Sequence, residues 1–395
     1  MRYISIFIKT SKFIALFLAI ASVPALGGWY LVSGQPAHSA TDKEATAMRP
    51  SSNADYSNII PTQIESDSTS LVDVTLEWLF DGASRKPAGP VPVRARTRES
   101  FAPSRADDLR LTWLGWASVL IHIDGLTVLT DPMLSRRTSP VPLVGPARLH
   151  EAPCDVAGLP DIDVVVISHD HYDHLDRATI RQLAKRGPLF AVPLGIGAYL
   201  RDWGVDADRI VELGWGDRTE IAGISFQATA ARHFSGRGLF DRNSTLWATW
   251  IIAGPSHRVF FGGDTGFFPG LEEIGAAQGP FDVTILPIGA YDAQWKDIHL
   301  FPEQAVEANR LLGGRSILPI HFATFDLALH AWDDPMERLL WEADRKGVPL
   351  LTPIPGQTVD PRMPVETFPW WRAAAGTPRE KTRRLGRRLS PHGGS

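Results

Sequence analysis

Four side chains of the kinds that bind metal ions follow an apolar run within six residues, and this pattern constrains the chain more than any other. The run Val164–Ile167 predicts a buried strand, after which come His169, His171, Asp173 and His174. Burying so many polar groups without a partner costs several kcal/mol, and a metal ion supplies that partner. Alternation at the strand end lets His169 and His171 face one ion, while Asp173 and His174 on the following turn reach a second ion. The motif therefore predicts a site for two metal ions.

Cysteine content and charge restrict the kind of site and the kind of partner. The 395 residues include a single cysteine, Cys154, which excludes an intramolecular disulfide and a cage of two or more thiolates. Nitrogen and oxygen must therefore supply the metal ligands, and the chain has 12 histidines. With 40 Lys and Arg against 44 Asp and Glu, the formal net charge is −4. No nucleic-acid partner is expected, because such proteins carry a broad positive surface.

Short apolar runs that end at Gly, Pro or Asp begin at Leu109 and predict strands. These runs are Leu109–Ile123, Leu126–Leu129, Val164–Ile167, Ile224–Ala228, Val259–Phe261, Val283–Pro287 and Ser316–Ile320. Between some of them lie helical patterns, such as Pro302–Leu312, which Pro opens and Gly313 closes. Strands and helices mix over about 250 residues with no second boundary, which predicts a single α/β domain.

Three further ligand-type residues stand just after predicted strands. His233 follows the run that starts at Ile224, Asp264 follows Val259–Phe261 and two glycines, and His321 follows Ile320. Each alone has an ordinary alternative, because an Asp before Thr-Gly is common in turns and a His at a strand end is commonly structural. As a set that accompanies the motif, they are candidates for the remaining ligands of two ions.

The order of these residues resembles that of the metallo-β-lactamase superfamily. Within it, the chain is most similar to the family of phospholipases D that hydrolyse N-acylphosphatidylethanolamine and their bacterial relatives. The similarity runs from about Leu111 to about Gln357. The segments that carry it are Trp113–Leu120, Leu129–Pro132, Ser139-Pro140, Gly145-Pro146, Ser168–Asp176, Phe261–Gly266, Pro287–Tyr291 and Ile320–Phe325.

The resemblance implies a fold, a cofactor and a ligand for each metal position. The fold is a four-layer αββα sandwich with the metal ions at one edge, and the cofactor is two Zn²⁺ per chain. The resemblance assigns His169, His171 and His233 to the first zinc, Asp173, His174 and His321 to the second, and Asp264 to a bridge between them.

Three residues around the ligands have more specific expectations. Asp131 is the candidate acceptor for the N–H of a ligand histidine, although an Asp before Pro also forms turns. His299 matches a histidine of the family and is expected to contact the phosphate or protonate the leaving group; the alternative is an exposed residue before a helix. Trp116 stands where family members usually have His, outside the seven ligands, so it bears on substrate choice rather than on metal binding.

Two zinc ions can lower the pKa of a bridging water to about 7 and so generate hydroxide at neutral pH. The resemblance implies that this hydroxide attacks the phosphodiester of an N-acylphosphatidylethanolamine-like phospholipid and releases phosphatidic acid and an N-acylethanolamine. The metal chemistry alone also fits a hydrolase of lactones or β-lactams. A third alternative is a non-catalytic anchored binding protein whose metals brace the fold, although all seven ligand positions are filled.

Four parts are expected along the chain. Arg2, Lys9 and Lys12 precede the apolar run Phe13–Val32, which predicts either a cleaved signal peptide or an N-terminal membrane anchor. The catalytic domain would then lie outside the cytoplasm, with a membrane surface as a partner. The parts are 1–33, the signal peptide or anchor; 34–104, a linker or N-terminal arm; 105–362, the catalytic domain; and 363–395, a basic C-terminal tail.

Overall fold

The computed structural model describes most of the chain from Asp55 onward. The described ranges are 55–63, 84–102, 105–141, 143–238, 240–363 and 367–375. The expected signal peptide or membrane anchor at 1–33 and the basic residues after 375 lie outside them. Among the described residues, no helix combines the length and the apolar character needed to cross a membrane.

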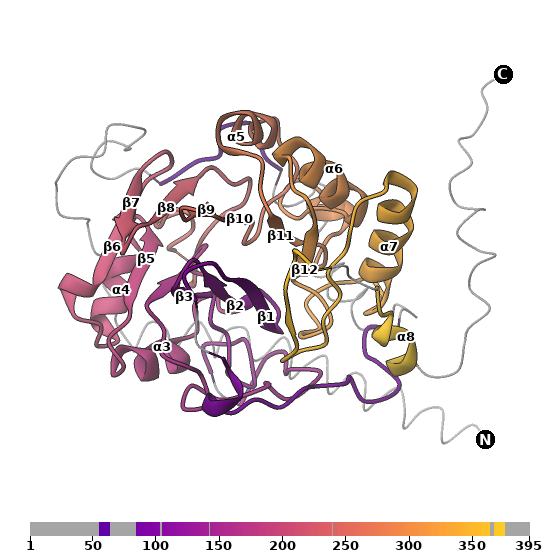
Figure 1. Ribbon diagram of the computed structural model, residues 1–395, viewed down its shortest axis with the longest axis horizontal. Helices are drawn as coiled ribbons and strands as arrows, with labels where there is room; N and C mark the ends of the chain where they lie inside the picture. Colours follow the sequence, from indigo (N-terminus) through magenta and orange to yellow (C-terminus); the bar gives the residue numbers. More distant parts are fainter. Residues whose placement is uncertain are drawn as a thin grey trace.

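Two β-sheets form the framework of the molecule (Figure 1). The first has the order β13-β1-β2-β3-β4-β5-β6, comprising Thr358–Val359, Leu109–Gly115, Ser118–Ile123, Leu126–Thr130, Val164–Val166, Leu189–Pro193 and Ile210–Leu213. The second has the order β12-β11-β10-β9-β8-β7, comprising Ile317–Ile320, Val283–Pro287, Arg258–Phe261, Thr249–Ala253, Ile224–Thr229 and Arg218–Ile221. Strands β3 to β6 are parallel in the first sheet, as are β10 to β12 in the second.

Helices cover the outer face of each sheet (Figure 1). The first sheet is covered by α3, Arg177–Ala184, and α4, Ile196–Asp202, and the second by α5, Gly270–Gln278, α6, Pro302–Leu312, and α7, Asp334–Lys346. Within the described ranges, short 3₁₀ helices span Arg98–Ser100, Ala207–Arg209 and Ala293–Trp295. The expected four-layer αββα arrangement is confirmed.

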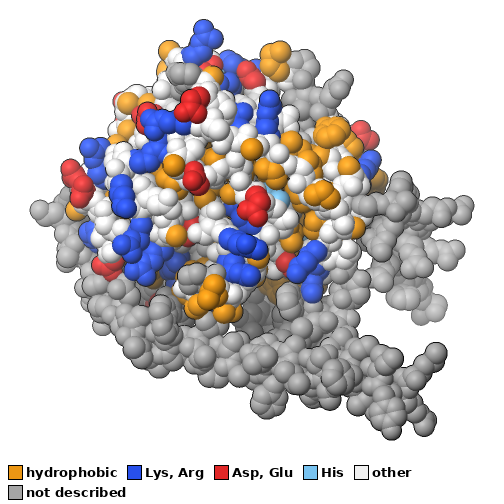
Figure 2. Space-filling model, turned by 90° about the horizontal axis from the view of Figure 1, so that it is seen from below, with side chains coloured by type: hydrophobic (Ala, Val, Ile, Leu, Met, Phe, Trp, Pro, Cys, Tyr) orange, Lys and Arg blue, Asp and Glu red, His pale blue; other side chains and the backbone are white. Residues whose placement is uncertain are grey.

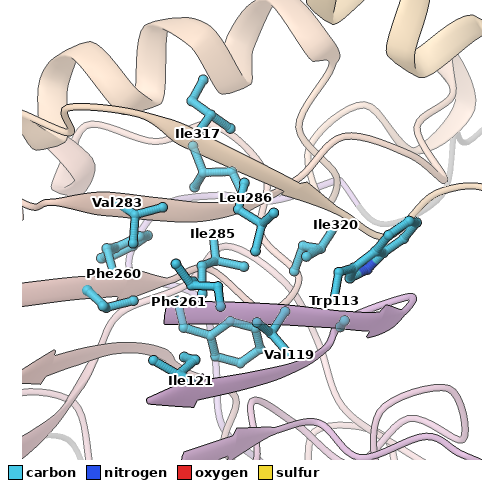
Figure 3. Close-up of a cluster of buried hydrophobic side chains, with 14 of the residues drawn as sticks. Trp113, Val119, Ile121, Phe260, Phe261, Val283, Ile285, Leu286, Ile317 and Ile320 are labelled. Carbon is cyan, nitrogen blue, oxygen red and sulfur yellow. The ribbon is translucent and has the colours of Figure 1, made fainter. Parts of the chain in front are cut away.

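The main core lies between the two sheets (Figure 3). Val119 and Ile121 of β2 share one buried cluster with Phe261 of β10 and Ile285 of β11. Leu120, which alternates with them along β2, belongs instead to the cluster under α3 and α4. Because both faces of the central strands are covered, these strands have continuous apolar sequences rather than alternating ones.

Local sequence features predict some boundaries of helices and strands correctly but not others. Helix α6 ends as expected at Gly313, whose φ of +69° is the left-handed conformation that glycine adopts at little cost. The run Leu109–Ile123 is two antiparallel strands rather than one, because the chain turns at Trp116, which has a φ of +53°. No apolar run predicted β7, since its residues alternate between exposed and half-buried at the edge of the sheet.

Segments on both sides of the range 105–362 pack onto the domain. Val91 and Phe101 are buried before it. After it, α8, Trp370–Ala374, places Trp370 and Trp371 in the main core, each with a side chain about 1% exposed. The folded unit therefore includes parts of the expected N-terminal arm and C-terminal tail.

The surface is of mixed character on the face shown in Figure 2, where Lys and Arg side chains alternate with Asp and Glu and with apolar patches. A few large apolar side chains of the described residues are exposed: Ile59, Leu143, Val144, Phe240, Trp341, Met363 and Phe368. Such side chains are candidates for contact with an apolar partner when they cluster.

Candidate metal centre

The ends of four strands bring the expected metal ligands together. His169–His174 follow β4, His233 follows β8, Asp264 follows β10, and His321 directly follows β12. His321 has a φ of +65°, an uncommon backbone conformation for a residue with a side chain, and such residues concentrate at functional sites. The carboxyl ends of neighbouring parallel strands are a common place for ligand sites in α/β proteins.

The seven expected ligands form two groups, within each of which all the ligand atoms lie within 4.8 Å of one another. The first group consists of His169, His171 and His233, and the second of Asp173, His174, Asp264 and His321. In the first group, Nδ1 of His171 lies 2.8 Å from Nε2 of His169 and 3.3 Å from Nε2 of His233. The grouping is the one that the resemblance implies.

Asp264 lies between the two groups. Its Oδ2 is 3.0 Å from Nε2 of His321 and 3.2 Å from Nε2 of His174, both in the second group. The same oxygen is 3.8 Å from Nε2 of His233 in the first group. One carboxylate is therefore within reach of both positions, which is the geometry of a bridging ligand.

Buried atoms without hydrogen-bond partners test whether these residues fit a metal ion. Among the described residues, the buried unpartnered atoms include Nε2 of His174, Oδ1 of Asp264, Nδ1 of His299 and both ring nitrogens of His321. An unpaired buried polar atom is costly, so a cluster of them calls for a further binding partner. Imidazole nitrogens and carboxylate oxygens are ligands that zinc accepts. The residues therefore fit a metal ion of this kind.

The charges of the site also fit a cation. Burial opposes ionisation of Asp264, but His174 and His321 outweigh burial and hold its pKa well below the usual value. Conversely, Asp264 and Asp173 raise the pKa of His174 well above its usual value, although burial opposes this. In the first group, burial lowers the pKa of His233 to about 4, which leaves a neutral imidazole that can bind a metal ion. The carboxylates thus need positive charge beside them, from protonated imidazoles or from metal ions.

Asp131 lies where the sequence placed it, beside the ligand histidines. Its Oδ2 accepts a hydrogen bond from Nδ1 of His174 at 2.7 Å, which directs Nε2 of that ring toward the second group. Asp131 also accepts bonds from the amide and the hydroxyl of Ser168, at 2.7 and 2.6 Å. The Ser168 hydroxyl lies 2.9 Å from Nδ1 of His169, so a single buried carboxylate orients ligands of both groups.

His299 is largely buried rather than an exposed residue before a helix. Its side chain is 11% exposed, and its Nδ1 lies 3.9 Å from Oδ2 of Asp264. The ring packs against His321 and His233, with ring centroids 5.3 and 5.1 Å apart. Burial lowers the pKa of His299 well below the usual value, so its imidazole is neutral.

Trp116 contacts the second group directly. Its indole N–H donates to Oδ2 of Asp173 at 3.0 Å, and its ring lies 3.9 Å from the ring of His321. The sequence predicts that this position affects substrate choice while metal binding is kept, and the contact adds a link to a candidate ligand. The contact follows from the left-handed turn after β1, which the sequence did not predict.

A cavity of about 290 Å³ opens over the two groups. It is lined by His171, Asp173, His233, Asp264, His299 and His321 together with Phe234, Ala290, Trp295, Ile298 and Leu327. The polar residues are all members or neighbours of the ligand groups, and the other residues give an apolar wall. The cavity therefore combines a charged floor with apolar sides.

Comparisons with known proteins agree with this geometry. Residues 127–322 match the model of the β-lactamase superfamily domain. An uncharacterised protein of Mycobacterium tuberculosis is 47% identical over 304 residues, which cover 76% of this chain and 80% of that protein. The N-acyl-phosphatidylethanolamine-hydrolyzing phospholipase D 1 of Caenorhabditis elegans is 36% identical over 249 residues, 60% of this chain and 69% of the relative.

A more distant relative matches the chain in sequence, and a solved structure matches it in fold. A metal-dependent hydrolase of Sulfolobus acidocaldarius is 30% identical over 254 residues, 64% of this chain and 99% of that protein. The solved structure of a metallo hydrolase from Ignicoccus hospitalis matches with a TM-score of 0.50 at 23% identity, over 64% of this chain and 97% of that one. The chain belongs to the β-lactamase superfamily. Within it, the chain is homologous to N-acylphosphatidylethanolamine-hydrolysing phospholipase D and to metal-dependent hydrolases.

Proposed function

We propose that the protein is a di-zinc phosphodiesterase of phospholipase D type that acts on N-acylphosphatidylethanolamine-like phospholipids. The observation that carries the proposal is the position of Oδ2 of Asp264, 3.0 Å from His321 in one ligand group and 3.8 Å from His233 in the other. A carboxylate shared in this way suits a pair of ions that act together on one substrate. The homologous phospholipase D of Caenorhabditis elegans supports the choice of substrate class.

Each part of the site has a role in the proposed hydrolysis. Zinc ions bound by the seven ligands would activate water and neutralise the oxygens of the phosphodiester. Asp131 holds His174 in the orientation that ligation needs. His299, buried and neutral, lies beside Asp264, where a ring N–H can donate a hydrogen bond to a phosphate or leaving-group oxygen. The lowered pKa of His299 favours this contact over protonation of the leaving group, which requires the protonated form.

The walls of the cavity support a lipid-like substrate. Phe234, Trp295, Ile298 and Leu327 line it with apolar surface above the ligand groups. An acyl chain gains free energy from such a wall, while the charged phosphodiester faces the polar floor.

Location and membrane contact form part of the same proposal. The basic N-terminus and its apolar run support export or membrane anchoring, with the catalytic domain outside the cytoplasm. Leu143 and Phe240 are 86% and 90% exposed, so each is accessible to a membrane surface. An enzyme held at a bilayer meets lipid substrate at high effective concentration.

A substrate panel tests the proposed activity. The purified full-length chain, in mild detergent with zinc, is given N-acylphosphatidylethanolamine in mixed micelles, a chromogenic phosphodiester, a lactone and a cephalosporin. We expect release of phosphatidic acid and an N-acylethanolamine, detected by mass spectrometry, and a rate lower by about a hundredfold or more in Asp264→Ala. Turnover of only the lactone or the cephalosporin would replace the phosphodiesterase by the alternative hydrolase. No turnover of any of them would favour the non-catalytic alternative.

A further inference from the structure

Residues 55–63, which we call the strap, lie beside the metal centre without regular secondary structure. Along the strap, even-numbered residues are half-buried and odd-numbered residues are exposed, so one edge faces the domain. Near one end, the amide of Tyr56 donates to the carbonyl of Asn243 at 2.9 Å. At the other end, the amide of Gln63 donates to Oδ2 of Asp297 at 3.0 Å. The strap is thus fixed to two loops that both border the site.

Asn58, in the middle of the strap, holds the backbone of a ligand. Its Oδ1 accepts a hydrogen bond from the amide of His233 at 3.0 Å, and its Nδ2 donates to the carbonyl of the same residue at 2.7 Å. Two opposed bonds to one residue fix both the position and the rotation of its backbone. The imidazole Nδ1 of His233 lies 3.0 Å from the carbonyl of Ile298, so its Nε2 is left to face His171.

Arg232, next to His233, ties the strap to the other loops of the site. Its guanidinium donates to the carbonyl of Pro61 at 2.9 Å and to the hydroxyl of Thr62 at 3.2 Å. The same group lies 2.7 Å from a carboxylate oxygen of Asp297 and donates to the carbonyl of Phe267. Asp297 stands two residues before His299, so the strap, His233 and the loop of His299 belong to one network.

We propose that Asn58 is a positioning residue for the metal ligand His233 and that the strap completes the metal position formed by His169, His171 and His233. The inference rests on the proposed role of these histidines as zinc ligands. His233 lies beyond the end of β8, which stops at Thr229, so the strand pairing of β8 does not hold the backbone of His233. The amide side chain of Asn58 supplies the two hydrogen bonds that a neighbouring strand would otherwise provide.

The test measures zinc binding directly, so that it does not depend on the substrate. Zinc is titrated into the chelated full-length chain in competition with a chromophoric chelator, for the wild type, Asn58→Ala and the control Ser57→Ala, whose side chain is exposed. We expect Asn58→Ala to weaken one zinc site by about 10-fold to 100-fold, the usual effect of losing a group that orients a ligand. The control should keep both affinities of the wild type. Hydrogen exchange of the His233 amide should be faster in Asn58→Ala than in the wild type or in Ser57→Ala.

The isosteric Asn58→Asp variant provides a second comparison if Asn58→Ala does not fold. It keeps the acceptor for the His233 amide, loses the donor to the His233 carbonyl, and is expected to weaken the same zinc site. Wild-type affinities at both sites in either folded variant, with unchanged exchange at His233, would overturn the role of Asn58. Failure of the wild type itself to bind zinc would instead refute the proposed function, so the two failures are distinguishable.

Discussion

At the scale of single residues, Trp116 shows how a departure from a family pattern acts on the site. Its indole N–H donates to Oδ2 of Asp173, the oxygen that lies 3.4 Å from both His174 and His321. A hydrogen bond to a ligand oxygen fixes the direction in which that oxygen faces a metal ion. We therefore propose that Trp116 orients Asp173 at the second metal position while its ring packs against His321.

We predict that Trp116→Phe weakens one zinc site by about tenfold, because it removes the N–H donor and keeps an aromatic ring over His321. Competition titration with zinc measures this change. Trp295→Phe is the matched control, since Trp295 lines the cavity but donates to the carbonyl of Ala290 and not to a ligand. The control should alter the apparent KM and leave both zinc affinities unchanged. Equal zinc affinities in Trp116→Phe and wild type would contradict the orienting role.

The sequence indicated the candidate ligands that the structure brings together, but only some of the contacts that support them. The motif around His169 concentrates four ligands in one turn, and Asp131 stands before a proline at a strand end, so both have local patterns. Asn58 has none, because it lies 175 residues from His233 in a segment rich in Ser and Pro. Contacts between residues so far apart arise from tertiary structure and leave no periodicity in the chain.

Among the elements, the positions of the strand ends explain why candidate ligands that are far apart in the sequence come together in one site. Residues that follow β4, β8, β10 and β12 converge at one edge of the sandwich because the strands of each sheet run side by side. Their apolar runs marked these strands, whereas the polar edge strand β7 had no such run. The order of the strands in each sheet could not be predicted, since it depends on pairing between distant segments.

A buried histidine of strand β2 is expected to make the stability of the protein depend on pH. His122 is 2% exposed within it, and burial, helped by the charge of Arg110, lowers its pKa to about 4. The unfolded chain takes up a proton at this residue near pH 6.5, which the folded chain does only near pH 4. The free energy of unfolding should therefore fall as the pH drops through this window, by up to about 3 kcal/mol from this residue.

Urea denaturation of the chelated protein at pH 7 and pH 5 measures this effect. The difference in the free energy of unfolding between the two pH values should be smaller by about 2 kcal/mol in His122→Gln than in the wild type. Comparing the two proteins cancels the contribution of the ligand histidines, which both retain. An equal difference in both would show that His122 does not contribute to the acid sensitivity.

At the scale of the whole molecule, the folded unit extends at both ends of the expected catalytic domain. The strap reaches the metal centre from the N-terminal side, and α8 inserts Trp370 and Trp371 into the core from the C-terminal side. The polar composition of both regions predicted a linker and a tail. Composition averaged over a region does not indicate the short segments within it that pack onto the domain. The family resemblance did predict the four layers, since its motifs lie at the strand ends that define them.

The proposed function requires that two metal ions bound by the seven candidate ligands carry out hydrolysis. The most direct measurement is to add zinc in steps to the chelated full-length chain while following metal bound per chain and the rate of N-acylphosphatidylethanolamine hydrolysis in the same sample. We predict that the rate rises with bound zinc and reaches its plateau at about two ions per chain. A chain that binds no zinc, or a rate that does not change as zinc binds, would contradict the proposed function.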